Sequence, residues 1–184
     1  MKMKIFLPMM ILAVLASAVL TGCSTKPIDE LKMTRIAREQ ARNAEAPEYD
    51  PYGWDRAGAQ WDEANALIQM GRYGEARSVL IEAVGNYNKA REEATRRVES
   101  LKIEIKALQS SAETELKNLE QAGMSAKATP LVRNRIDKAL SLIEEKIATM
   151  NSDYEDKEYL RSRMAGHEAL RYIQELRNRL AITY

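Results

Sequence analysis

Residues 73–121 read YGEARSVLIEAVGNYNKAREEATRRVESLKIEIKALQSSAETELKNLEQ and contain no proline. Their apolar side chains recur every three or four positions, the spacing of one helical face and close to a coiled-coil heptad. This face comprises Leu80, Ala83, Tyr87, Ala90, Ala94, Val98, Leu101, Ile105, Leu108, Ala112, Leu116 and Leu119. We expect one helix about 70 Å long. It passes through weak helix formers at Gly85 and Ser110-Ser111.

Two shorter helices are predicted before this long one. Pro27 permits a helix from about Ile28 that ends before Pro47. Its sparse apolar stripe consists of Leu31, Ile36 and Ala37.

A second helix is predicted from Pro51 to about Met70. Asp50 is a favoured N-cap type, and Pro51 suits the first helical position. Gly71 permits the left-handed turn that commonly ends a helix. The segment therefore predicts a helical hairpin with the long helix.

After a loop at residues 122–128, Thr129 and Pro130 have the residue types that start another helix. Its apolar face comprises Val132, Ile136, Leu140, Ile143, Ile147 and Met150. We expect Asn151 to end it. Ser152 and Glu155 then have the spacing of a capping box.

The capping box predicts a last helix with Leu160, Met164, His167, Leu170, Ile173, Leu176 and Leu180 on one side. Short connections between amphipathic helices favour antiparallel packing. The predicted fold is all-α: a helical hairpin joined through the long helix to an antiparallel three-helix bundle or coiled-coil-like hairpin.

The composition agrees with this fold class. Charged residues make up 30% of the chain, there is a single Phe, and no alternating apolar segments suggest strands. Without Lys2 and Lys4, 26 of the 28 basic residues remain against 27 acidic ones. This balance does not indicate a nucleic-acid partner.

The first residues resemble a bacterial export signal. Lys2 and Lys4 precede an apolar run from Ile5 to Leu20, which is too short for a typical transmembrane helix and is followed by polar sequence. A retained transmembrane anchor is therefore the weaker interpretation.

Leu20-Thr21-Gly22-Cys23 resembles the lipobox of bacterial lipoproteins. The resemblance implies that the Cys23 thiol receives a diacylglyceryl group, that residues 1–22 are removed, and that the new amine is acylated. The residue after the cysteine is Ser24 and not Asp. In the lipoproteins that this motif resembles, that usually means release to the outer membrane, so the resemblance implies an outer-membrane location facing the periplasm. Because Cys23 is the only cysteine, the alternatives are a buried thiol or a disulfide between two copies of the chain.

The middle of the chain also resembles a family of helical domains of unknown function in bacterial envelope lipoproteins. The residues that carry this resemblance are Ala41, Ala44, Ala46, Tyr49, Pro51, Ala57, Trp61, Ala64, Leu67, Gly71, Tyr73, Ala76, Ala83, Ala90 and Ala94. It implies a helical exported module and no assigned activity. Members often carry a peptidoglycan-binding module, for which this chain has no room.

Residues 64–83 partly resemble a single tetratricopeptide repeat. Ala64, Leu67, Gly71, Tyr73, Ala76, Leu80 and Ala83 match its small, large and turn positions. Gln60 occupies the usual tryptophan position, and the terminal proline is absent. Since one repeat cannot bury its core alone, we expect a hairpin stabilised by its neighbours.

No residue pattern indicates an enzyme, a metal site or another cofactor site. His167 is the only histidine, and we interpret it as a core or boundary residue. The acidic residues Asp153, Glu155, Asp156 and Glu158 could bind a divalent cation, but acids also favour a helix N-terminus. No Gly-rich phosphate loop or nucleophile motif is present.

Aromatic residues concentrate in the first half of the chain, at Tyr49, Tyr52, Trp54, Trp61, Tyr73 and Tyr87. One interpretation is that these rings form the core of the hairpin. The alternative is that Tyr52 and Trp54 remain exposed and bind a partner, because aromatic side chains dominate interface hot spots. Trp61 and Tyr73 are expected at packing positions.

The predicted organisation is a signal peptide at 1–22, a lipidated tether at 23–35, an Ala-rich hairpin at 36–94 and a bundle at 95–184. We expect a non-catalytic envelope lipoprotein, held in the membrane through lipid on Cys23, that presents a helical interaction or scaffolding module to envelope proteins in the periplasm. The alternative is a self-associating coiled-coil spacer, a homo-oligomer.

Overall fold

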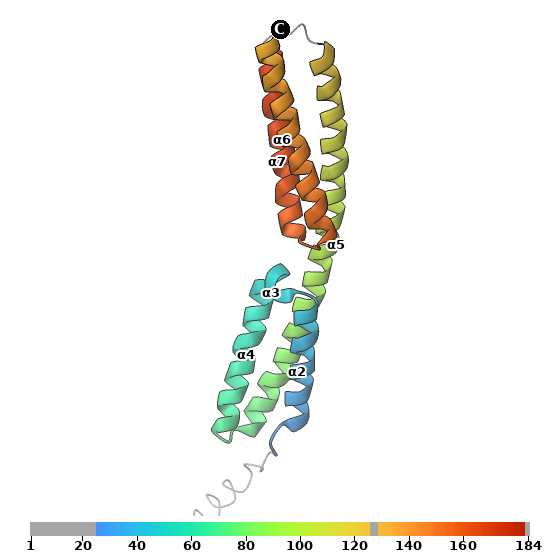
Figure 1. Cartoon of the computed structure of the whole chain (residues 1–184). Helices are drawn as coiled ribbons and strands as arrows, with labels where there is room; N and C mark the ends of the chain where they lie inside the picture. The colour runs from blue at the N-terminus through green and yellow to red at the C-terminus, as the bar shows by residue number, and fades with distance from the viewer. Residues whose placement is uncertain (1–24, 126–128, 183–184) are drawn as a thin grey trace, which may run out of the picture. The chain divides into compact units, whose positions relative to one another are not determined.

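A computed structural model describes residues 25–125 and 129–182. Within these ranges every regular element is an α-helix. The predicted all-α fold class is therefore confirmed. The chain divides into two compact units between Glu93 and Ala94, and helix α5 contributes residues to both (Figure 1).

The first unit consists of α2 (Ile28–Asn43), the short α3 (Ala46–Tyr49), α4 (Pro51–Gln69) and the first part of α5 (Tyr73–Ser125). Hydrogen bonds between side chains give the helix directions. Along α2 and α5, Glu30 contacts Arg77 and Gln40 contacts Arg91, so these helices run parallel. The α4–α5 contacts are Arg56 with Asn86 and Gln60 with Glu82, which makes that pair antiparallel.

Helix α2 begins at Ile28, the residue at which the sequence predicts a start. Residues 28–35, assigned above to the tether, are therefore helical. They also contact α5, because Thr34 is buried and its hydroxyl lies 3.3 Å from the Leu80 carbonyl oxygen. The predicted stripe is partly wrong: Ala37 is buried, but Ile36 is 49% exposed, because the small side chains Thr34, Ala37 and Ala41 form the contact face.

Alanines dominate the core of the first unit. Those without exposed surface are Ala41, Ala46, Ala57, Ala64, Ala76, Ala83 and Ala90, and the large fully buried side chains are Leu80 and Tyr87. Small side chains allow helix backbones to approach closely. At Gly53, an added Cβ would lie 3.3 Å from the Cβ of Ala90 and 2.0 Å from the Asp50 carboxylate. A side chain at Gly53 would therefore displace the Asp50 carboxylate from its capping position and press on Ala90 where α4 starts against α5.

Helix α4 has both ends predicted by the sequence. The Asp50 carboxylate accepts a hydrogen bond from the Gly53 backbone at 3.3 Å, and Pro51 occupies the first turn. At the other end Gly71 has φ +74°, and the Arg72 amide donates to the Leu67 carbonyl. Together with the hydrogen bond from the Gly71 amide to the Ile68 carbonyl, this bond forms a Schellman turn, which directs the chain into α5.

Helix α5 is continuous over 53 residues, through Gly85 and Ser110-Ser111 as predicted. It ends at Ser125, so residues 122–125 of the expected loop are helical. Gly85 is exposed, and a Cβ there would have no neighbour within 4 Å. The helix thus tolerates Gly85 without using its lack of a side chain.

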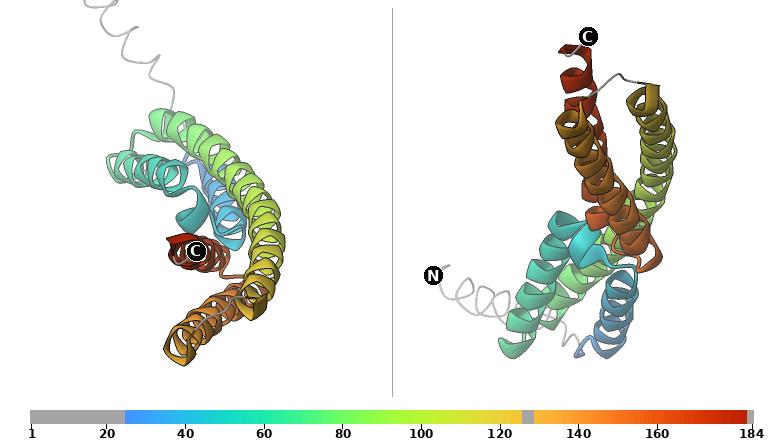
Figure 2. Two further views of the ribbon diagram at one scale, coloured as in Figure 1. Left: turned by 90° about the horizontal axis from the view of Figure 1, so that it is seen from above. Right: turned by 45° about the horizontal axis from the view of Figure 1, so that its top comes forward.

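The second unit consists of the remainder of α5, α6 (Pro130–Glu155) and α7 (Tyr159–Ile182), which lie side by side (Figures 1 and 2). Helices α6 and α7 are antiparallel, since Lys146 pairs with Glu168 at 2.9 Å and Asp153 with Arg161 at 3.4 Å. The Ser162 hydroxyl donates a buried hydrogen bond of 2.7 Å to the Met150 carbonyl.

The predicted boundary between the last two helices is wrong. The Thr129 hydroxyl caps α6 as expected, but α6 continues through Asn151 and Ser152 to Glu155. The chain turns instead at Lys157, whose φ is +65°. The Glu158 amide donates to the Asp153 carbonyl, and the Lys157 amide donates to the Tyr154 carbonyl. This is a Schellman turn with lysine at the usual glycine position.

The predicted face of α7 is also partly wrong. Met164 is 60% exposed and His167 is exposed. Ile173 and Leu176 are buried as predicted, and the rest of the buried side carries Tyr159, Ser162, Ala165, Gly166 and Ala169. Small residues mark this face because the helices are close there: a Cβ on Gly166 would lie 2.8 Å from the Met150 sulfur and 3.2 Å from Leu108.

Among the described helices, none combines the length and the apolar character that crossing a membrane requires.

Candidate functional site

Of the two sites predicted from the sequence, only one lies within the described residues. Cys23, the predicted lipidation residue, lies outside the described residues. Tyr52 and Trp54, the predicted partner-binding residues, lie in the first turn of α4. The aromatic segment that contains them, residues 46–54, is therefore the site that can be built from contacts.

Backbone geometry determines how this segment enters α4. Glu45 follows α2 in a left-handed conformation, with φ +58°. Pro47 lies in the first turn of α3, and the Asp50 amide donates to the Ala46 carbonyl at 2.8 Å. Tyr49 is only 2% exposed. The segment thus contains a helical turn held by a buried tyrosine, which the sequence analysis does not predict.

Tyr52 is exposed to solvent, with 78% of its surface accessible. The Arg56 guanidinium lies 6.0 Å from the centre of its ring, one helical turn along α4. Arg56 also donates a hydrogen bond of 2.8 Å to the Asn86 side chain on α5. This second contact restricts the guanidinium, so Tyr52 and Arg56 present an aromatic ring and a positive charge together.

Trp54 lies in a different environment from Tyr52. It is half-buried, and its ring meets that of Tyr87 edge to face, with 5.3 Å between centroids and an interplanar angle of 65°. The Arg38 guanidinium of α2 lies 5.7 Å from the Trp54 ring. Trp54 therefore links all three long helices of the first unit, and only Tyr52 is fully available to a partner.

The other two aromatics have intermediate exposure. Trp61 on α4 and Tyr73 at the start of α5 are half-buried. This position is compatible with the packing role expected for them.

Two polar atoms near Trp54 lack hydrogen-bond partners among the described residues. They are the Tyr87 hydroxyl oxygen and the Arg38 Nε, and both are buried. Burial raises the pKa of Tyr87, because removal from water disfavours the phenolate. The nearby Arg38 charge opposes this shift to a smaller extent.

The residues considered for catalysis or metal binding do not converge on one site. His167 is exposed and its Nε2 lies 3.3 Å from a Glu104 carboxylate oxygen on α5. Asp153 is buried and pairs with Arg161 instead of forming a cluster with its acidic neighbours. Within residues 25–125 and 129–182, no three His, Cys, Asp or Glu side chains gather as metal ligands.

The described surface also has two shallow hollows. One lies between α5 and α6 and is lined by Glu113, Leu116, Lys117, Glu120, Glu144, Ile147, Ala148 and Asn151. The other lies on α2 and is lined by Lys26, Ile28, Leu31, Lys32, Arg35, Ile36 and Glu39. The hollow on α2 combines apolar and basic side chains, whereas acidic residues outnumber basic ones in the hollow between α5 and α6.

Arg38 is the site residue that the sequence analysis misses. It lies on α2, 16 positions before Trp54, and no local motif joins the two. A weak signal exists: Arg38 neighbours the buried Ala37, so it occupies the edge of the packed face. The Trp54–Arg38 contact depends on how α2 packs against α4, which periodicity alone does not specify.

Comparison with known protein families, with curated proteins and with solved structures gives no significant match to this chain. The resemblances to a helical lipoprotein domain and to a single tetratricopeptide repeat therefore stay predictions.

Proposed function

We propose that this chain is a non-catalytic lipoprotein of the bacterial envelope, anchored by lipid on Cys23, that presents a helical interaction module in the periplasm. The observation that carries the proposal is Leu20-Thr21-Gly22-Cys23 behind the apolar run from Ile5 to Leu20. More than one acyl chain at Cys23 provides stable anchoring, since each buried methylene contributes about 0.8 kcal/mol. The resemblance to bacterial lipoproteins, with Ser24 after the cysteine, implies that this membrane is the outer membrane.

The anchoring is tested by Cys23→Ser in cells that receive an alkyne-labelled fatty acid. The parent chain is expected to incorporate the label and to partition into detergent. Cys23→Ser is expected to remain unlabelled and to appear as an uncleaved or soluble product. Ser24→Ala is a control that leaves the cysteine intact. Label incorporation into Cys23→Ser, or normal cleavage with unchanged membrane recovery, would contradict the proposal.

The interaction role is supported by Tyr52 and Arg56. An exposed aromatic ring beside a restrained guanidinium provides two residue types that are enriched at interface hot spots. In this proposal the partner is an envelope protein that covers the Tyr52 ring.

Crosslinking in intact cells, followed by quantitative mass spectrometry, tests the role of Tyr52. Loss of a hot-spot ring weakens association by about 2 kcal/mol, or roughly 30-fold. Tyr172→Ala is the matched control, because Tyr172 lies beside Arg171 in the second unit, with the guanidinium 4.9 Å from its ring. Tyr52→Ala is expected to lose partners that Tyr172→Ala retains. Equal recovery with both variants would contradict a binding role for Tyr52.

The alternative, a self-associating spacer, requires an apolar seam that is free to pair. Most of the α5 seam is buried within the chain, including Leu80, Tyr87, Leu101, Ile105 and Leu119. Sedimentation of the Cys23→Ser chain separates the two functions. We expect a monomer at all concentrations, and a mass that doubles with concentration would favour the spacer.

A further inference from the structure

Helix α2 has two apolar residues on the side opposite its packed face. Thr34, Ala37 and Ala41 are buried against the first unit. At 100° per residue, Ile28 and Ile36 lie on the other side of the helix. They are 66% and 49% exposed, respectively. Leu31, which is half-buried, lines the same hollow as these two isoleucines. The three side chains form an apolar patch rimmed by polar residues, the kind of patch that marks a protein or membrane interaction site.

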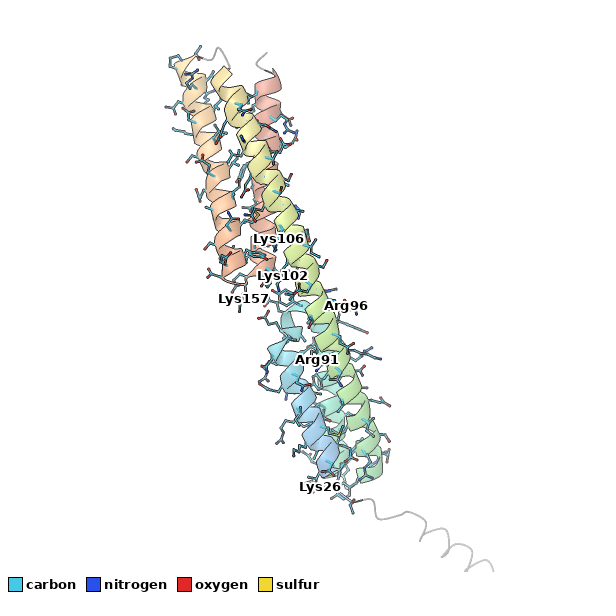
Figure 3. All side chains as sticks on the ribbon, turned by 90° about the vertical axis from the view of Figure 1, so that its right-hand side faces the viewer. Lys26, Arg91, Arg96, Lys102, Lys106 and Lys157 are labelled. Atoms are coloured by element: carbon cyan, nitrogen blue, oxygen red, sulfur yellow. The ribbon has the colours of Figure 1, made fainter. Side chains whose placement is uncertain are left out.

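Basic residues surround these isoleucines. Lys26, Lys32 and Arg35 line the same hollow as Ile28 and Ile36. Within the part of the chain that the structure describes, none of the three takes part in an ion pair, whereas Glu39, the acid in this hollow, pairs with Arg42 at 3.5 Å. Figure 3 labels Lys26, which lies two residues before the start of α2. Lys32 lies between the two isoleucines, one helical turn from each, so the surface alternates apolar and basic side chains, and basic residues outnumber the acid Glu39 in the hollow.

This surface begins close to the proposed anchor. Ile28 follows Cys23 by five residues, and an extended chain of that length spans at most about 18 Å. Lipid on Cys23 would therefore keep the start of α2 near the bilayer surface. Ile28 and Ile36 are separated by about 12 Å along the helix axis, so both can contact one flat surface.

We propose that residues 26–36 form a membrane-docking surface, which rests α2 on anionic phospholipids of the membrane that carries the anchor. Ile28 and Ile36 enter the boundary between headgroups and acyl chains, while Lys26, Lys32 and Arg35 bind lipid phosphates. Basic side chains around an apolar face are typical of helices that lie in a membrane interface. The inference rests on the proposed anchoring at Cys23, and it adds a second contact that orients the first unit.

Lysine footprinting on vesicles tests this surface without natural lipidation. The chain from Cys23 onward is coupled through its single thiol to a maleimide lipid, in vesicles of phosphatidylcholine with or without phosphatidylglycerol. Lysines are then acetylated briefly and the products are quantified by mass spectrometry. Lys26 and Lys32 are expected to react at least fivefold more slowly on phosphatidylglycerol, whereas the exposed residues Lys89 and Lys138 react equally on both.

Replacement of both isoleucines provides the second arm. Ile28→Gln with Ile36→Gln should abolish most of the protection of Lys26 and Lys32. Because both positions are exposed, these substitutions should leave the fold intact. The matched control is Ile81→Gln with Ile103→Gln, which removes isoleucines that are 59% and 72% exposed on α5. This control is expected to keep the protection seen in the parent chain.

Equal reactivity of Lys26 and Lys32 on both vesicle types would overturn the proposal. If Lys26 and Lys32 are protected equally on both vesicle types and this protection disappears when the protein is diluted, a second copy of the chain covers the surface. That result would also overturn the proposal. Because the maleimide lipid replaces the natural anchor, failure of lipidation at Cys23 would not change these outcomes.

Discussion

At the scale of single residues, Trp54 and Tyr52 differ although they are two positions apart. Trp54 contacts Tyr87 and Arg38, whereas the Tyr52 ring is 78% exposed. Truncation of a fully buried tryptophan costs about 3–5 kcal/mol, and a half-buried one should cost about 2 kcal/mol. Tyr52→Ala should change the free energy of unfolding by less than about 0.5 kcal/mol. Chemical denaturation of both variants measures the difference, and equal losses would show that Tyr52 is also a core residue.

Tyr87 makes a residue-scale prediction about stability at neutral pH. Its hydroxyl is buried without a hydrogen-bond partner among the described residues, and such a group costs about 1–3 kcal/mol. Tyr87→Phe should therefore raise the free energy of unfolding by about 1 kcal/mol at pH 7. Tyr52→Phe removes an exposed hydroxyl and serves as the control. A loss of stability in Tyr87→Phe would mean that the hydroxyl is hydrogen-bonded, for example to water.

The raised pKa of Tyr87 adds a pH dependence. The unfolded tyrosine loses its proton near pH 10, while the folded one keeps it to higher pH. Ionisation of Tyr87 then favours the unfolded state. The free energy of unfolding is therefore unaffected by this ionisation below about pH 10, and it falls as the pH rises from there through the pKa of Tyr87 in the folded protein. Denaturation between neutral and alkaline pH should show a steeper loss for the parent than for Tyr87→Phe. Parallel curves would contradict the assignment.

At the scale of elements, the α6–α7 turn carries a non-glycine residue where glycine is usual. Lys157, which Figure 3 labels, has φ +65°. A left-handed conformation costs an L-residue roughly 1–2 kcal/mol. Lys157→Gly should therefore raise the free energy of unfolding by about 1 kcal/mol. Glu144→Gly, at an exposed position in the interior of α6, should lower it by about 1 kcal/mol. Thermal melting of both variants tests the turn, and destabilisation by Lys157→Gly would show that its side chain contributes to packing.

At the scale of the whole molecule, the two units have cores of different composition. The second unit buries Leu101, Ile105, Leu119, Ile136, Ile143, Met150, Ile173 and Leu176, whereas alanines dominate the first. Larger apolar side chains bury more area, at about 25 cal/mol per Å². Residues 94–184 should therefore fold alone and melt cooperatively, at a higher temperature than residues 25–93. Circular dichroism of both fragments measures this, and a non-cooperative melt of 94–184 would show that it needs the first unit.

Local chemistry in the sequence predicts much of the fold. Pro27, Asp50, Gly71 and Thr129 each define a helix end through a backbone requirement that acts within a few residues. The α5 seam is predicted equally well, because apolar residues recur at helical spacing from Leu80 to Leu119. The exposed Tyr52 is also predicted, whereas Trp54 is not fully exposed, because its environment includes Arg38 from α2.

Only the tertiary structure decides which face of α2 and α7 is buried. In both helices small residues, such as Ala37 and Ala169, form the contact face, while Ile36 and Met164 are exposed. Periodicity of large apolar residues predicts these faces only in part, because close approach to a neighbouring helix favours small side chains at positions such as Ala37 and Ala169, although Ile173 and Leu176 of the predicted α7 face are buried. The α6–α7 turn follows the same logic: Lys157 has no local signal for φ +65°, and the packing of the two helices imposes it. By itself the sequence determined the helices and most of their ends, because those depend on neighbouring residues. The packed faces depend on residues far apart in the chain.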